Sequence, residues 1–196
     1  MSLEDKNRWD KKYKTNVIPT KIVEVVEKYA KLAIGKNALD IACGMGRNSK
    51  FLATEGFQVD ALDISQIAIE KLQNIENITA QEVDFDTYTL KENSYDLIVC
   101  TYYLNRSLFS QIEKALKEDG IFIFQTFMHH ADNTKSPSNK SFLLEEGELE
   151  ITFDDRYELL HISEFMDEGV CGEKSMKASM VAKKKRGGMT DDDFWA

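Results

Sequence analysis

The sequence contains few cysteines, few prolines and no long apolar run. Its three cysteines, Cys43, Cys100 and Cys171, follow no C-x-x-C spacing, which excludes a disulfide framework and favours a reducing, cytoplasmic location. No apolar stretch approaches the ~20 residues that a membrane span needs, and the polar start MSLEDKNRWDKKYK is unlike a signal peptide. We therefore expect no membrane partner.

Basic residues are scarce relative to acidic ones, because 25 Lys and Arg stand against 34 Asp and Glu, a net charge of −9. Such a surface repels phosphate backbones, so nucleic acid is not an expected partner. The hydrophobic fraction of 42% is that of a soluble globular protein. We expect one domain over residues 1–186, with 187–196 as a mobile tail. A monomer and a homodimer are both left open.

Apolar patterning predicts alternating strands and helices. The expected strands are 37–42, 57–63, 78–85, 95–101 and 121–127, and the expected helices are 22–32, 47–55, 65–72 and about 108–116. A helix near 144–153 and strands 157–165 and 175–183 follow, with no room for a crossover helix between these last two strands. The pattern predicts an α/β fold, a Rossmann-like three-layer sandwich with a mostly parallel seven-stranded sheet and a C-terminal antiparallel hairpin.

A glycine-rich turn, Asp40-Ile41-Ala42-Cys43-Gly44-Met45-Gly46, follows the first expected strand. Ligands of such sheets bind beyond the carboxyl ends of the strands, where this turn lies. Gly44 and Gly46 let the backbone approach a ligand, and the helix that begins near Arg47 directs free N–H groups at the same place. Asp63 ends the second strand, where a carboxylate can accept hydrogen bonds from both hydroxyls of a ribose.

Two ligand classes share this geometry. The dinucleotide fingerprint G-x-G-x-x-G fails here because Ser49 stands at the third glycine, although a nicotinamide-dependent reductase remains an alternative. The S-adenosylmethionine version has an acidic residue four places before Gly44, and Asp40 occupies that position. Asp84 adds an acceptor for an adenine amino group and Phe85 a face for its ring, unless Asp63 and Asp84 only cap their strands.

The segments ALDIACGMGRNS, FLATEGFQVDALDIS, YDLIVCTYYLNRSLF, LKEDGIFIFQTF and SFLLEEGELEITF resemble class I S-adenosylmethionine-dependent methyltransferases of the tellurite-resistance, TehB-like type. The resemblance implies that 1–186 is a class I methyltransferase domain with 1–20 as an N-terminal lid segment, in which Trp9 and Tyr13 pack over the donor. The donor-binding residues it implies are Asp40, Ala42, Cys43, Gly44, Gly46, Arg47, Asn48, Asp63, Ile64, Asp84, Phe85 and Thr101. Ala42 replaces a frequent glycine at little expected cost, and Asn105-Arg106 replaces a frequent His-Arg pair.

Methyl transfer is an in-line displacement, so the protein must chiefly orient donor and acceptor. Candidate catalytic residues are His129 as a base, Arg106 as an oxyanion ligand or helix cap, and Tyr103 as a wall beside Tyr102 and Phe127. His129 and its neighbour His130 are a poor metal pair, no other spacing indicates a metal, and His161 is assigned to structure.

Several acceptors are compatible with the sequence, namely a chalcogen oxyanion, a thiol or a small acid. A non-catalytic S-adenosylmethionine-binding sensor or partner protein remains an alternative. A nucleic-acid methyltransferase is disfavoured by the net charge and by TYYLNR, which stands where an N/D-P-P-Y motif would be expected.

Overall fold

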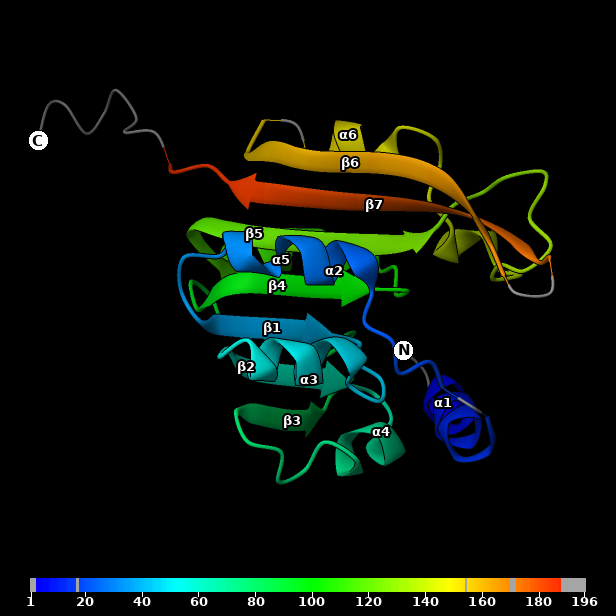
Figure 1. Ribbon diagram of the computed structural model, residues 1–196, viewed down its shortest axis with the longest axis horizontal. Helices are drawn as coiled ribbons and strands as arrows, with labels where there is room; N and C mark the ends of the chain where they lie inside the picture. Colours follow the sequence, from blue (N-terminus) through cyan, green and yellow to red (C-terminus); the bar gives the residue numbers. More distant parts are fainter. Residues whose placement is uncertain (1–2, 17, 154, 170–171, 188–196) are drawn as a thin grey trace, which may run out of the picture.

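A seven-stranded sheet with helices on both faces forms the frame of the computed structural model, which describes residues 3–16, 18–153, 155–169 and 172–187 (Figure 1). The strand order is β3-β2-β1-β4-β5-β7-β6. The strands are β1 (Asn37–Ile41), β2 (Gln58–Asp63), β3 (Ile78–Glu82), β4 (Tyr95–Thr101), β5 (Leu116–Phe127), β6 (Tyr157–Glu168) and β7 (Lys174–Lys184). Strands β1 to β5 pair in parallel and β7 is antiparallel to both β5 and β6, which confirms the predicted fold class.

Two apolar cores lie on the two faces of this sheet. The helices are α1 (Leu3–Thr15), α2 (Glu24–Tyr29), α3 (Arg47–Thr54), α4 (Gln66–Glu70), α5 (Phe109–Ala115) and α6 (Glu148–Thr152), with short 3₁₀ turns η1 (Ala30–Leu32), η2 (Arg106–Leu108) and η3 (Lys140–Phe142). Leu97 and Val99 of β4 pack with residues of α2 and α3, whereas Ile98 and Cys100 pack with residues of α5 and α6. Successive strand residues point to opposite faces, so a run apolar throughout is buried on both sides.

The structure differs most from the expected element boundaries at four places. Residues 3–15 form the helix α1, where only a lid segment was expected. Strand β5 begins at Leu116 directly after α5, so Gly120 lies inside a strand rather than at a helix end, and a register shift between Tyr95 and Leu97 accommodates the extra residues. Strand β3 ends at Glu82, and α6 is only five residues long. Leu116 fits both the helical periodicity and the strand, which is why periodicity misplaced this boundary.

The carboxyl ends of the parallel strands lie on one side of the molecule, and α1 lies on that same side (Figure 1). Among the described residues no helix is both long and apolar enough to cross a membrane. Cys171 and residues 188–196 of the expected tail lie outside the described residues.

Candidate donor and acceptor sites

The glycine-rich turn adopts left-handed backbone angles at three positions, with φ of +55° at Ala42, +53° at Gly44 and +74° at Gly46. A Cβ on Gly46 would lie 2.3 Å from Leu72 Cδ2, and one on Gly44 would lie 2.7 Å from the Tyr13 hydroxyl. The glycines are therefore required both by their angles and by close packing. The expectation that Ala42 costs little was wrong, because a residue with a Cβ is strained in this conformation.

Asp40 is fully buried at the end of β1, below this turn. Ser49 donates a hydrogen bond from its hydroxyl to Asp40 Oδ2 at 2.5 Å. Burial raises the pKa of Asp40 to about 7, although the Ser49 hydrogen bonds and the nearby Arg47 act in the opposite direction. In the sequence, Ser49 was notable only because it replaces the third glycine of the dinucleotide fingerprint. In the structure its hydroxyl group orients Asp40.

Asp63 ties the end of β2 to the same turn. Its Oδ2 accepts a hydrogen bond from the Gly44 N–H at 2.8 Å, and its Oδ1 accepts one from the Ser65 N–H at 2.9 Å. Burial raises the pKa of Asp63, while these backbone N–H groups oppose the rise. Two carboxylates thus lie buried on adjacent strands beside one loop, an arrangement that favours a cationic, hydroxyl-bearing ligand.

Asn48 and Thr101 join the elements around the turn. The Asn48 side chain donates to the Thr101 hydroxyl at 3.0 Å and accepts from the Val23 N–H at 3.3 Å. Both side chains are buried, as are those of Cys43 and Ile64. These four predicted donor-site residues therefore surround the turn, with Asn48 and Thr101 linking α3, β4 and the start of α2.

Phe85, Asp84 and Tyr103 lie together at the neighbouring strand ends. The rings of Phe85 and Tyr103 are 5.6 Å apart, and Phe85 is buried. Asp84 Oδ1 accepts a hydrogen bond from the Asp86 N–H at 3.0 Å. Tyr103, a candidate catalytic residue, thus lies beside the residues expected to hold adenine, and its pKa is raised mainly by burial.

Helix α1 lies over the glycine-rich turn. The Tyr13 hydroxyl lies beside Gly44, and the rings of Tyr13 and Trp9 stack 5.6 Å apart. Asp10 accepts hydrogen bonds from the Ser65 hydroxyl and, at 3.3 Å, from the Ile67 N–H. The carboxylate of one helix therefore caps the first turn of α4, which fixes α1 in place. The role of 1–20 as a lid remains a prediction.

Tyr102 follows β4 in a left-handed conformation, with φ of +61°. Its hydroxyl accepts hydrogen bonds from Gln125 Nε2 at 2.9 Å and from Lys177 Nζ at 3.4 Å. The Arg47 guanidinium carbon lies 4.9 Å from the centre of the ring, and the Phe127 ring lies 5.4 Å away. Two cations and two aromatic rings therefore converge next to the turn. Lys177, only 8% exposed and ion-paired with Asp167, is a residue that the sequence analysis did not identify.

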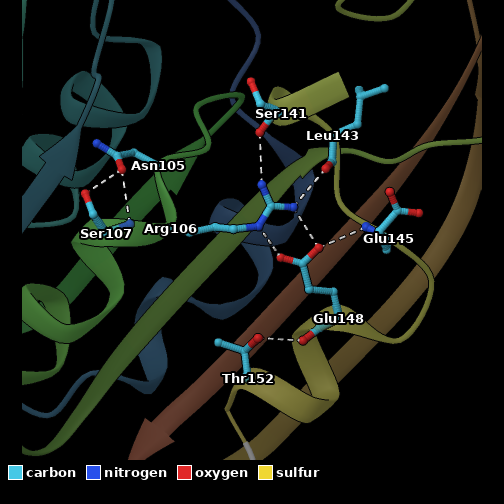
Figure 2. Close-up of polar contacts among 8 residues, drawn as sticks. All are labelled: Asn105, Arg106, Ser107, Ser141, Leu143, Glu145, Glu148 and Thr152. Carbon is cyan, nitrogen blue, oxygen red and sulfur yellow. Dashed lines mark hydrogen bonds and ion pairs between the residues drawn. The ribbon is translucent and has the colours of Figure 1, made fainter. Parts of the chain in front are cut away.

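Arg106 is engaged by Ser141, Leu143 and Glu148 (Figure 2). Its Nε and Nη2 contact the Glu148 carboxylate at 2.6 and 2.8 Å, and Nη1 and Nη2 donate to the carbonyls of Ser141 and Leu143 at 2.9 Å. The guanidinium thus joins η2 to the segment before α6, which disfavours its expected role as an oxyanion ligand. His129 is exposed at the end of β5, and its N–H donates to the Leu144 carbonyl at 2.8 Å. Its role as a base remains a prediction.

Comparison with known proteins identifies the family. The sequence profile described as "Tellurite resistance protein TehB" matches residues 1–174. The chain belongs to the TehB family. It is 31% identical over 194 residues to the TehB of Haemophilus influenzae strain Rd, described as a probable S-adenosyl-L-methionine-dependent methyltransferase, and the match covers 90% of this chain. This chain spans 66% of the length of that relative.

Solved structures agree with this assignment. The crystal structure of Haemophilus influenzae TehB superposes with a TM-score of 0.72 at 27% identity, covering 92% of this chain and 67% of that one. A phosphoethanolamine N-methyltransferase 2 of Haemonchus contortus, in complex with S-adenosyl-L-methionine, superposes with a TM-score of 0.64 over 83% of this chain and 51% of that one; at 16% identity it shows the fold alone. The predicted TehB-like class I methyltransferase is confirmed at the level of family and fold, and these relatives support S-adenosylmethionine as the cofactor.

Proposed function

We propose that this TehB-family chain transfers the methyl group of S-adenosylmethionine to a small anionic acceptor held beside Tyr102. The observation that carries the proposal is the buried Asp40, oriented by Ser49 at the glycine-rich turn. An isolated buried carboxylate is unfavourable unless a cation approaches it, and the ammonium group of the donor is such a cation. The pyrophosphate of a dinucleotide would be repelled there, which argues against the reductase alternative.

The residues of the site fit each part of the donor. The free N–H groups at the start of α3 suit its carboxylate, Asp40 its ammonium group, and Asp63 its ribose hydroxyls. Ile64, Phe85 and Asp84 suit the adenine. When bound, the donor supplies a methyl group that its sulfonium already activates. Trp9 and Tyr13 of α1 exclude water from above the turn, which strengthens the electrostatic contacts below them.

The surroundings of Tyr102 favour an anionic acceptor. Arg47 contributes positive charge at the ring of Tyr102, and Lys177, whose ammonium group also pairs with the half-exposed Asp167, donates to the Tyr102 hydroxyl. Such charge stabilises an oxyanion, a carboxylate or a thiolate, and it lowers the pKa of a thiol that binds there. The acceptor then loses its proton to solvent before transfer, so this proposal requires no general base. His129 is therefore not needed for anionic acceptors.

Calorimetry with S-adenosylhomocysteine tests the donor site. We expect micromolar binding to the wild type and at least a hundredfold weaker binding to Asp63→Asn. Asp60→Asn is the matched control, because Asp60 lies on the same strand but pairs with Lys91 and Tyr95 instead of the turn. If the wild type does not bind the compound, or if both variants weaken binding equally, the proposal fails.

Mass spectrometry of products formed from selenite, tellurite, thiols and small acids tests the transfer. Lys177→Met should raise the KM for an anionic acceptor at least tenfold and leave the affinity for S-adenosylhomocysteine unchanged. Tight donor binding with no product from any acceptor would instead favour the non-catalytic sensor.

A further inference from the structure

A cavity of about 230 Å³ lies between α2 and the β5-β7-β6 part of the sheet. The lining includes Tyr29 from α2 and, from the strands, Gln125, His161, Ser163, Phe165 and Ser179. The space holds the volume of roughly eight water molecules, which suits a single-ring organic molecule. None of the residues assigned above to the donor lines this cavity.

The floor of the cavity belongs to a polar row that crosses four strands, and the three members of this row on β5, β7 and β6, namely Gln125, Ser179 and Ser163, line the cavity. Thr101 pairs with Gln125, Gln125 with Ser179, and Ser179 with Ser163. Paired residues share one face of a sheet, so these side chains form one line. Two residues away on β5 and β7 the same face carries Ile123 and Val181, which belong to the apolar core. The face thus changes from apolar to hydrogen-bonding at the row where the cavity lies.

The wall of the cavity is aromatic. The rings of Tyr29 and His161 stack 5.1 Å apart with an interplanar angle of 28°, and Phe165 is a third ring. His161 Nε2 lies 3.1 Å from the Ser179 hydroxyl. Burial and the neighbouring Lys28 lower the pKa of His161, which favours the uncharged form of its imidazole. Flat faces next to hydrogen-bonding groups are typical of a pocket for an aromatic molecule.

The cavity and the proposed acceptor site share a boundary at Gln125. Gln125, which lines the cavity, donates to the Tyr102 hydroxyl at 2.9 Å. Phe165, also in the lining, pairs directly with Lys177 across β6 and β7. A molecule with its ring in the cavity can therefore place a substituent at Lys177, beside Tyr102.

We infer that this cavity holds the ring of an aromatic acceptor, whose anionic nucleophilic atom lies at Lys177. The inference rests on the proposed function and specifies its acceptor class. For an aromatic thiol, the thiol proton has already gone to solvent. The thiolate electron pair forms the new sulfur–carbon bond, and the donor's carbon–sulfur bond breaks with its pair remaining on the donor sulfur. The negative thiolate and the positive sulfonium are thereby both converted into neutral thioethers.

Thiophenol is a suitable probe, with 2-mercaptoethanol and selenite as acceptors that lack a ring. The decisive variant is Ser163→Phe, which puts a ring into the cavity from β6, two strands away from Gln125, and Ser163→Ala is its matched control. Binding of thiophenol is measured by calorimetry on protein saturated with S-adenosylhomocysteine, and methyl transfer by mass spectrometry. Thermal unfolding establishes that each variant is folded; Ser179→Leu serves in its place if Ser163→Phe is not.

We expect thiophenol to bind at least tenfold more tightly than 2-mercaptoethanol, and to be methylated. Ser163→Phe should weaken thiophenol binding at least tenfold and leave the KM values of the ringless acceptors and the affinity for S-adenosylhomocysteine unchanged, whereas Ser163→Ala should have little effect. Equal affinity for thiophenol and 2-mercaptoethanol would overturn the inference. The inference would also be overturned if Ser163→Phe bound thiophenol as tightly as the wild type, or if thiophenol bound without being methylated. Failure of S-adenosylhomocysteine to bind would instead refute the proposed function.

Discussion

Replacing Asp40 by Asn should make the protein without donor more stable while weakening its affinity for the donor. Asp40 is buried, and burial raises its pKa from 3.8 to about 7. The folded chain therefore holds this proton more tightly than the unfolded chain, so the free energy of unfolding falls as pH rises from 3.8 to 7. Above pH 7 Asp40 is ionised in both the folded and the unfolded chain, and burying its charge lowers the free energy of unfolding by the full amount. The difference between the two pKa values corresponds to ~4 kcal/mol.

Asparagine removes this penalty and can still accept the Ser49 hydrogen bond through its oxygen. Its amide N–H₂ is left in a buried position, which costs ~2 kcal/mol. The net gain at pH 8 is therefore ~2 kcal/mol, a rise in Tm of ~4–8 °C for a domain of this size. At pH 5 the remaining penalty of Asp40 is only ~2 kcal/mol, so the two proteins should unfold at nearly the same temperature.

Calorimetric melting of wild type and Asp40→Asn at pH 8 and pH 5 measures this difference. Asp60→Asn is the control of opposite sign, because its carboxylate is paired with Lys91 and hydrogen-bonded to Tyr95 and should lose stability on neutralisation. This prediction is refuted if Asp40→Asn melts below the wild type at pH 8, or if its higher Tm is the same at pH 5 as at pH 8. Either result would mean that Asp40 does not carry an unpaired buried charge in the protein without donor.

Four further predictions follow from the site. The affinity of the wild type for S-adenosylhomocysteine should fall ~10-fold between pH 8 and pH 6, because protonated Asp40 cannot pair with its ammonium group, and calorimetry of Asp40→Asn should show no such dependence. Ala42→Gly should raise the free energy of unfolding in urea by ~1 kcal/mol, since the residue has a left-handed φ; a loss of stability would contradict this. Asp10→Ala should expose α1 to limited proteolysis and lower stability by ~1 kcal/mol, because α4 loses part of its cap, whereas Asp5→Ala should do neither. Arg106→Lys should lower stability by ~1 kcal/mol and leave acceptor KM unchanged; a raised KM at unchanged stability would restore the oxyanion role.

The sequence predicts the sheet well because buried parallel strands read as apolar runs. The strands around Val59, Val99 and Ile123 were placed correctly for this reason, and the lack of a crossover helix before Ser175 predicted the antiparallel hairpin. Boundaries were less well predicted where one residue satisfies two patterns, as at Leu116. Helix α1 was not expected, because its residues are mostly polar and its position depends on docking.

For the site, local spacing located the acidic residues but not their partners. Asp40 and Asp63 follow from their distance to Gly44 along the chain. The hydrogen bond from Ser49 to Asp40 was not predicted, because it depends on the rotation of α3 against β1. Lys177 was missed because its burial depends on strand register, and the partner of Arg106 lies 42 residues away, where no spacing rule applies.

The sheet order separates two tasks along the chain. The residues that we propose for the donor come from the segment 40–85 with Thr101, whereas those that we propose for the acceptor come mainly from β5 and the β6-β7 hairpin, with Tyr102 between them. Selection can therefore alter the hairpin without disturbing the donor, and a relative's hairpin grafted at the end of β5 is a natural unit of recombination. Divergence in acceptor scope among related proteins should accordingly concentrate in the last third of the sequence.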